Sequence, residues 1–101
     1  MFGIRVVEED GSIIQKMVAH PKFNPVRAGI DATKYPMLGS IDPYGDTSLN
    51  YLQCAMLVNE LREGGEVLTG MGVAPEFIHE LIRLCQLSRS KPHRQLLFIG
   101  D

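Results

Sequence analysis

The sequence lacks an excess of charge of either sign, and it lacks a long hydrophobic run. Ten lysines and arginines stand against twelve aspartates and glutamates, a formal net charge of −2. Domains that bind nucleic acid usually carry a basic excess that matches the phosphates, so we predict no nucleic-acid partner. No apolar stretch approaches the roughly 20 residues of a membrane-spanning helix, so we also predict no membrane partner.

Cysteine is scarce as well. Cys54 and Cys85 are the only two, and both fall in stretches that are expected to be helical. We interpret them as buried free thiols in a reducing compartment, with a disulfide or redox pair as the alternative. No histidine stands at ligand spacing from either one, so the sequence predicts no metal site. The N-terminus lacks the basic and apolar segments of a signal peptide, and we expect a cytoplasmic protein.

The rest of the composition is that of one folded domain. Hydrophobic residues make up 45% of the chain and charged residues 22%, which is ordinary for a globular protein and unlike a disordered one. A chain of 101 residues can bury one core and little more. We therefore expect a single domain over residues 1–101.

The beginning of the chain predicts a β-hairpin. Two runs rich in Ile and Val, Gly3–Glu8 and Ile13–Ala19, flank Asp10-Gly11. An Asp-Gly pair between such runs is a strong hairpin signal, because both residues accept a positive φ. With a two-residue loop Arg5 faces Lys16, which is mildly unfavourable. A three-residue loop with a bulge is the alternative, and it would relieve this clash.

Periodicity and turn residues place five further elements. They are a loop over His20–Pro36, a strand over Tyr35–Ile41, a helix over Ser48–Glu63, a helix over Pro75–Ser90 and a last strand over Gln95–Ile99. Grouped strands followed by helices predict an α+β domain, in which an antiparallel or mixed sheet of about four strands is covered on one face by two helices. The last strand is apolar throughout, so we expect it inside the sheet.

The densest polar feature is the segment Ile41–Thr47. In a functional interpretation Asp42, Tyr44 and Asp46 line a pocket or bind a partner. In a structural interpretation Asp42 bonds to the turn backbone, and Asp46 or Thr47 caps the following helix. Both interpretations use residue types that suit a turn between two elements.

Positive charge gathers in two loops. Lys22, Arg27 and Lys34 lie in the first loop, and a second group precedes the last strand. Such groups either face water or form a surface for an acidic partner, because complementary charge selects and speeds association. The residues that we predict to bind a partner are therefore Lys22, Arg27, Lys34, Asp42, Tyr44 and Asp46.

The sequence contains no recognisable catalytic constellation. His20, His79 and His93 are far apart, and nucleophile elbows, phosphate loops and dinucleotide fingerprints are absent. We therefore predict no catalytic residue and no cofactor. A site that unites His20 and His93 with Asp42 is the alternative.

Two motifs together carry a resemblance. They are IDPYGDT at Ile41–Thr47, followed by Asn50 and Leu52-Gln53, and Pro92-His93 followed by LFIGD at Leu97–Asp101. With the N-terminal hairpin they resemble a family of small bacterial proteins of unassigned function, over about half of the chain. The resemblance implies no activity. Some bacterial proteins of this size and style are immunity proteins, which neutralise a toxin by binding it.

Three functions are compatible with these observations. The first is a non-catalytic protein-binding module, with an immunity-type inhibitor of a toxin as its specific form. The second is a small enzyme or ligand-binding domain that uses the acidic turn at residues 42–47. The third is a homodimeric structural protein that pairs exposed strand edges.

Overall fold

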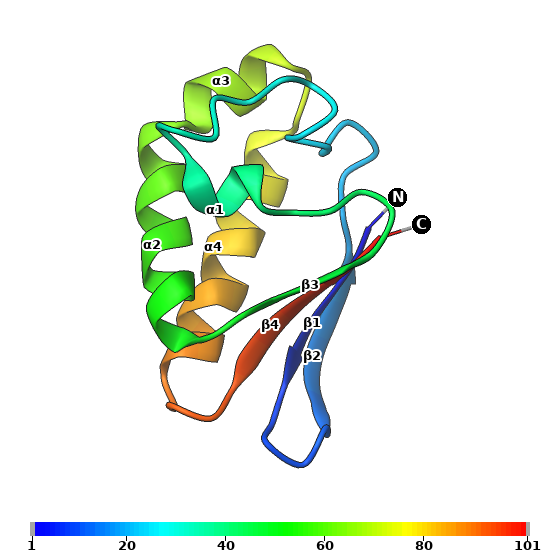
Figure 1. The fold of residues 1–101 in the computed structure, drawn as a ribbon, viewed down its shortest axis with the longest axis vertical. Helices are drawn as coiled ribbons and strands as arrows, with labels where there is room; N and C mark the ends of the chain where they lie inside the picture. The colour runs from blue at the N-terminus through cyan, green and yellow to red at the C-terminus, as the bar shows by residue number, and fades with distance from the viewer. Residues whose placement is uncertain (1, 101) are drawn as a thin grey trace.

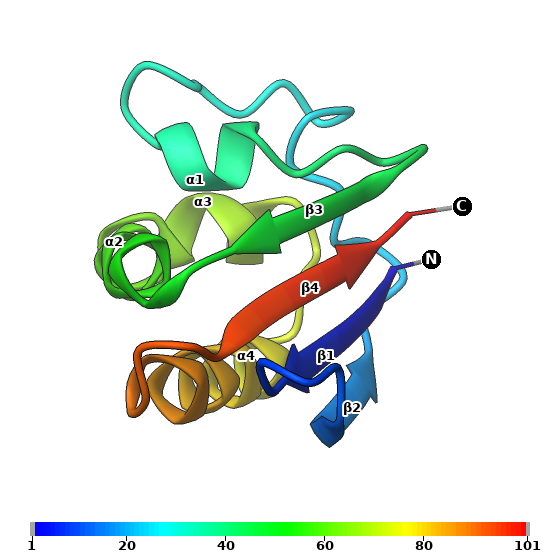
Figure 2. The same cartoon turned by 60° about the horizontal axis from the view of Figure 1, so that its bottom comes forward.

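The computed structural model describes residues 2–100, which form four strands and four helices. In chain order these elements are β1 (Gly3–Val7), β2 (Ile13–Val18), α1 (Pro36–Gly39), β3 (Asp46–Leu49), α2 (Tyr51–Glu63), α3 (Gly65–Gly70), α4 (Pro75–Arg89) and β4 (Gln95–Ile99). The strands form one antiparallel sheet in the order β2-β1-β4-β3. The two long helices, α2 and α4, pack side by side against one face of this sheet (Figures 1 and 2). The predicted α+β class is confirmed.

Alternation along the inner strands places the core between the sheet and the helices. Every second residue at this face of β1 and β4 is buried, namely Phe2, Ile4, Val6, Leu96 and Phe98. They pack with buried leucines of the helices, among them Leu57 and Leu61 of α2 and Leu81 and Leu84 of α4. Complete burial of such a side chain stabilises the fold by about 1.5–3 kcal/mol. The opposite face of the sheet has no helix against it among the described residues.

The predicted hairpin is present, and its central register is confirmed. Ile4 pairs with Met17, Arg5 with Lys16 and Val6 with Gln15. The loop has three residues, because the Glu8 amide donates to the Ser12 carbonyl at 2.8 Å and Gly11 adopts a φ of 88°. The register then shifts between Val6 and Val7. This bulge cancels the effect of the longer loop, so Arg5 faces Lys16 after all.

The strand predicted over Tyr35–Ile41 is wrong. Pro36 begins α1 instead, since its fixed φ suits the first position of a helix and Leu38 is completely buried. The third strand is β3, which lies in the segment expected to hold a turn and the start of a helix. Its four residues pair with β4.

The helix predicted from Ser48 begins three residues later, at Tyr51. Neither Asp46 nor Thr47 caps it. The Asn50 side chain accepts from the Gln53 amide, and the Gln53 side chain accepts from the Asn50 amide, each at 2.9 Å. This reciprocal arrangement is a capping box, which satisfies two backbone donors that a helix start would otherwise leave free.

The later elements agree better with their predictions. The second predicted helix is α4, whose bounds differ by one residue at the C-terminal end. The last strand is β4, which has the predicted bounds and lies inside the sheet. Gly64 ends α2 as expected, but Gly65 then begins the short helix α3.

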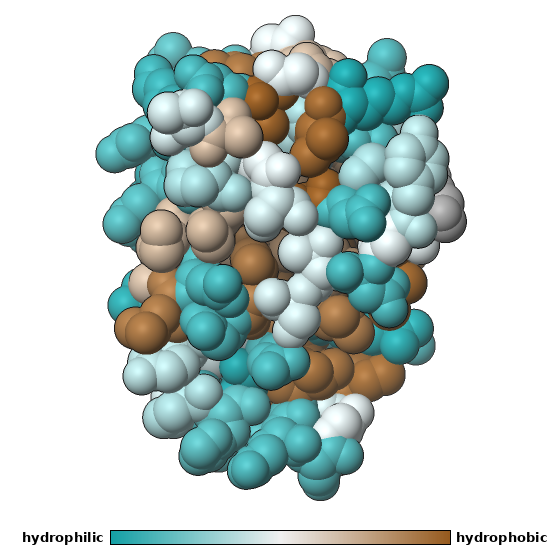
Figure 3. Space-filling model, in the orientation of Figure 1, coloured by the Kyte–Doolittle hydropathy of each residue, from teal (hydrophilic) through white to brown (hydrophobic). Residues whose placement is uncertain are grey.

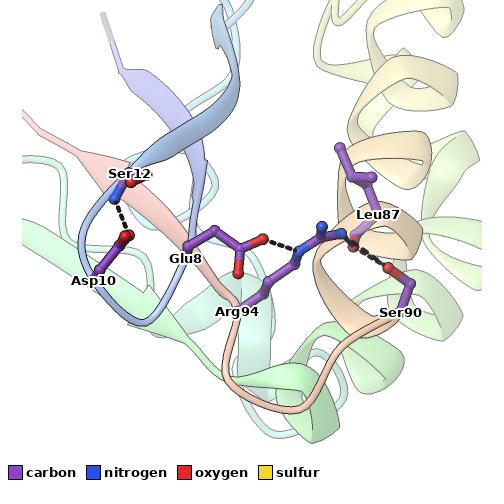
Figure 4. Close-up of polar contacts among 6 residues, drawn as sticks. All are labelled: Glu8, Asp10, Ser12, Leu87, Ser90 and Arg94. Atoms are coloured by element: carbon purple, nitrogen blue, oxygen red, sulfur yellow. Dashed lines mark hydrogen bonds and ion pairs between the residues drawn. The ribbon is translucent and has the colours of Figure 1, made fainter.

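Arg94 ties the hairpin to the end of α4 (Figure 4). Its Nε donates to Glu8 Oε1 at 2.8 Å, and its Nη1 donates to the Leu87 carbonyl and to Ser90 Oγ at 3.0 Å. The Arg94 side chain is only 12% exposed. One guanidinium therefore satisfies a carbonyl at the C-terminus of α4 and pairs with a carboxylate of the hairpin.

Candidate protein-binding surface

Hydrogen bonds within the turn and to the end of β4 hold the acidic turn. The Asp42 amide donates to Thr47 Oγ1 at 2.9 Å, and Asp42 Oδ1 accepts from the Tyr44 amide at 2.8 Å. The Gly100 amide donates to the Gly45 carbonyl at 2.8 Å. The Asp42 side chain thus bonds to its own loop, as the structural interpretation proposed.

The two motifs that carry the family resemblance contact each other. A Cβ atom on Gly100 would lie 2.5 Å from the Gly45 carbonyl oxygen and 2.8 Å from that of Asp42. Only a residue without a side chain allows this approach. The turn at Ile41–Thr47 therefore packs onto Gly100, the residue that follows β4.

Tyr44 stands out from this turn. It is 77% exposed, more than any other large hydrophobic residue in the part of the chain that the structure describes. Asp46 is also exposed and lies at the start of the edge strand β3. These two side chains are free to contact a partner, whereas the carboxylate of Asp42 is engaged in the turn.

The loop at His20–Pro36, called the basic loop below, is anchored by aromatic packing. Phe23 is 2% exposed, and its ring centroid lies 6.1 Å from that of Phe2 and 5.1 Å from that of Phe77. Hydrogen bonds between residues close in sequence shape the rest of the loop, for example from the Thr33 amide to Asp31 Oδ1 at 2.9 Å. The loop is therefore ordered by contacts of its own, although it contains no regular element.

The three cations of this loop are exposed and spread along its sequence. Figure 1 shows the course of the loop, coloured light blue to cyan. The Lys22 stem lies beside Gly72, and the Lys34 ammonium is 5.5 Å from the centroid of the Tyr35 ring. No ion pair involves Lys22, Arg27 or Lys34 within residues 2–100. No carboxylate among the described residues pairs with these charges, which could therefore serve an acidic partner.

His93 does not converge with the acidic turn. His93 precedes β4 and lies in a small polar hollow with Glu8 and Asn50, whereas the turn packs onto the residue that follows β4. A five-residue strand separates these two positions by about 17 Å. Over residues 2–100, no group of three histidines, cysteines or carboxylates is placed to hold a metal ion.

The two cysteines are free and completely buried. They face each other between α2 and α4, and the hydrogen bond with Cys54, together with removal from water, raises the pKa of the Cys85 thiol. A thiol with a raised pKa is a weak nucleophile. The prediction that both thiols are free and buried is confirmed. The sequence did not indicate that the two cysteines contact each other.

The displaced pKa values of charged side chains belong to surface contacts away from the turn. The Ser12 side-chain and backbone hydrogen bonds lower the pKa of Asp10 in the hairpin loop. The Arg83 guanidinium lowers the pKa of Glu80 through a hydrogen bond on the exposed side of α4. Neither group lies in a hollow, so neither is arranged for acid–base catalysis.

A further hollow in the described chain lies elsewhere, and the sequence did not predict it. It is a groove of about 800 Å³ between α4, α3 and the end of α2, with Leu61, Ile78 and Ile82 among its lining residues. The apolar spacing of α4 was visible in the sequence and was assigned to the core. What the sequence could not indicate is α3, which supplies the opposite wall.

Comparison with known proteins found no matching family model, no matching curated protein and no matching solved structure. The resemblance to the small bacterial family stays a prediction. No helix within residues 2–100 is long and apolar enough to cross a bilayer. The function must therefore be inferred from the surface of this α+β domain.

Proposed function

We propose that the protein is a non-catalytic protein-binding module whose contact surface includes the acidic turn and the basic loop. Tyr44 carries this proposal, because it is 77% exposed on a turn that hydrogen bonds hold in one conformation. Tyrosine is enriched among the residues that dominate binding energy. A rigid backbone also lowers the entropy that is lost when such a side chain is immobilised at an interface.

The surrounding charges suit the rim of such an interface. Lys22, Arg27 and Lys34 are exposed and have no internal ion pair within the described residues. Asp46 adds a negative charge close to Tyr44. Charges at the rim of an interface mainly steer association and exclude wrong partners. We propose that these residues, with Asp42 as the residue that holds the turn, form the binding surface.

The specific form that we propose is an immunity-type protein, which acts in the cytoplasm and neutralises a toxin by binding it. Small size and general style support this form by analogy. A binding protein of this kind needs a rigid recognition surface and no catalytic group. The acidic turn supplies a surface of that description.

The test is affinity capture from the producing bacterium with three forms of the protein. The wild type should retain one stoichiometric partner, Tyr44→Ala should lose it, and Tyr51→Ala should retain it. Tyr51 is a matched control because it is also an exposed tyrosine, at 38%, but lies at the start of α2. A partner captured equally by all three forms, or by none, would count against the proposal.

The enzyme or ligand-binding alternative requires a hollow around the acidic turn. Asp42 bonds to its own loop, and the principal hollows of the described chain are lined by other residues. The geometry therefore favours recognition over catalysis at this turn.

A further inference from the structure

A pair of buried thiols lies between the two long helices. Cys54 belongs to the first turn of α2 and Cys85 to the C-terminal half of α4, and both side chains are completely buried. The two helices pack side by side (Figure 1), and the two thiols interact with each other. Cysteines that meet across two packed helices are placed where a disulfide bond can join them.

Ser88 adds a hydroxyl group to the same part of the interior. It is completely buried, and its Oγ has no hydrogen-bond partner among residues 2–100. It lies beside Cys54. A buried donor without a partner costs stability, so such a group calls for an explanation. A thiolate on Cys54 would give this hydroxyl an acceptor, and the arrangement therefore suits a negatively charged sulfur.

The surroundings affect the two thiols in opposite ways. The hydrogen bond with Cys85 lowers the pKa of Cys54, with smaller contributions from Ser88 and from the charge of Arg89. The place of Cys54 in the first turn of α2 adds the positive end of the helix dipole. The hydrogen bond with Cys54 and removal from water raise the pKa of Cys85. Cys54 is therefore the thiol that ionises, and Cys85 is the one that keeps its proton.

The pair lies close to one end of the helical layer. Leu52, in the same first turn of α2 as Cys54, is 61% exposed. Ser88 lies in the last turn of α4, where the next two residues are exposed. The ends of helices open locally more readily than their centres. A small uncharged oxidant such as hydrogen peroxide can therefore reach the thiols without unfolding of the whole domain.

We propose that Cys54 and Cys85 form a peroxide-sensitive redox pair, in which oxidation joins α2 to α4 through a disulfide bond. The Cys54 thiolate attacks one oxygen of hydrogen peroxide, the O–O bond breaks, and the leaving hydroxide takes up the proton that Cys54 released. The Cys85 sulfur then attacks the sulfur of the resulting sulfenic acid, and the oxygen leaves as water with the Cys85 proton. The two sulfurs lose two electrons, and one peroxide becomes two waters.

The test treats the folded wild-type protein with hydrogen peroxide, blocks the remaining thiols with iodoacetamide and maps the tryptic peptides by mass spectrometry. Trypsin cuts after Arg62 and Arg83, so the two cysteines fall in separate peptides, residues 35–62 and 84–89. We expect these two peptides to be joined in protein that stays monomeric. Dithiothreitol should separate them again, because a disulfide is reversible.

Alanine variants assign the two roles. Cys85→Ala should stop at the Cys54 sulfenic acid, which dimedone traps. Cys54→Ala should leave a Cys85 that is oxidised at least about tenfold more slowly than Cys54 in Cys85→Ala, because each unit of pKa lowers the thiolate fraction tenfold.

Ser88 has a matched control. Ser88→Ala should slow formation of the disulfide by about twofold or more without changing the product, because a donor to the thiolate is lost. Ser40→Ala replaces an exposed serine at the end of α1 and should leave the rate unchanged.

Three results would overturn the proposal. They are a folded wild type that keeps both cysteines alkylated after peroxide, joined peptides that come only from dimers of two molecules, and equal oxidation rates in Cys54→Ala and Cys85→Ala. The first two use the wild type alone and hold even where a variant does not fold. Neither cysteine belongs to the acidic turn or the basic loop, so capture of a partner through Tyr44 tests the proposed function separately.

Discussion

Glu60 shows how one side chain can position a whole element. It is 7% exposed, and its two carboxylate oxygens accept from the Met37 and Leu38 amides at 2.9 Å each. These amides belong to the first turn of α1, whose N-cap Tyr35 makes no side-chain hydrogen bond. A carboxylate from α2 therefore replaces the local cap that α1 lacks.

Replacing this carboxylate should destabilise the protein. We expect Glu60→Gln to lower the free energy of unfolding by about 1–3 kcal/mol, because one buried amide would face an NH₂ group instead of an acceptor. Urea unfolding followed by circular dichroism measures the change. Glu63→Gln, at an exposed position of the same helix, is the control and should leave the midpoint unchanged. Equal midpoints for the two variants would show that the Glu60 bonds contribute nothing.

Gly100 is constrained by space rather than by backbone conformation. We expect Gly100→Ala to destabilise the protein by about 1–3 kcal/mol, because the new methyl group would overlap two backbone carbonyls of the turn that cannot move independently. Gly70→Ala should instead stabilise it by about 0.4–1 kcal/mol, since its Cβ meets nothing within 4 Å. Thermal unfolding of both variants compares these opposite signs. A neutral Gly100→Ala would mean that the turn is not packed against β4 as described.

Sequence patterns predict the hydrogen-bonding role of a residue when its partner is close in the chain. The bond from the Tyr44 amide to Asp42 was proposed correctly as one of two interpretations. The Asn50–Gln53 capping box is equally local. Asp46 is also a common N-cap residue type, so the sequence predicted the start of α2 too early. The role of Glu60 was beyond prediction, because its partners lie 22 and 23 residues away.

At the scale of elements, the predictions succeeded where a segment determines its own structure. The hairpin has its turn, α4 has its proline and apolar stripe, and β4 is apolar from Leu96 to Ile99. β3 was not predicted, because Asp46–Leu49 has little strand character of its own. This segment is extended because it pairs with β4, whose paired residues lie 47 or more positions later in the chain. α1 likewise forms on the surface of α2, where tertiary contacts override a weak local preference.

The edge strand β2 gives a prediction about association. Lys16 lies near the middle of this exposed edge, and an antiparallel pairing of two copies about the strand centre would bring two Lys16 ammonium groups together. We expect the wild type to be monomeric and Lys16→Val to self-associate in light scattering. Lys91→Val removes an exposed lysine outside the sheet and should stay monomeric. A wild-type dimer would instead favour the homodimer that strand-edge pairing suggests.

At the scale of the whole molecule, polar contacts join segments that are far apart in sequence at both ends of the sheet. At one end the acidic turn packs onto Gly100. At the other end Arg94 joins the hairpin to α4, across 86 residues of sequence. On the face shown in Figure 3, hydrophobic side chains form a broken line among polar ones rather than a continuous patch. Individual hydrogen bonds therefore add to the hydrophobic packing at both ends of the sheet.

The Arg94 contacts allow the two parts of this connection to be separated. Glu8→Gln removes only the charge that faces Arg94 Nε, whereas Arg94→Gln also removes the donors to Leu87 and Ser90. We therefore expect Arg94→Gln to cost about 2–3 kcal/mol of stability and Glu8→Gln about 1 kcal/mol or less. A double-mutant cycle in urea should give a coupling of about 0.5–1 kcal/mol between them.

Salt and an exposed ion pair supply the controls for this cycle. Sodium chloride should reduce the Glu8–Arg94 coupling, because Glu8 is one-third exposed, and should leave the larger part of the Arg94→Gln effect in place. Arg83→Gln breaks the exposed Glu80–Arg83 pair and should cost less than about 1 kcal/mol. If Arg94→Gln is no more damaging than Arg83→Gln, the link between the hairpin and α4 is not a source of stability, and the core alone holds this end of the sheet.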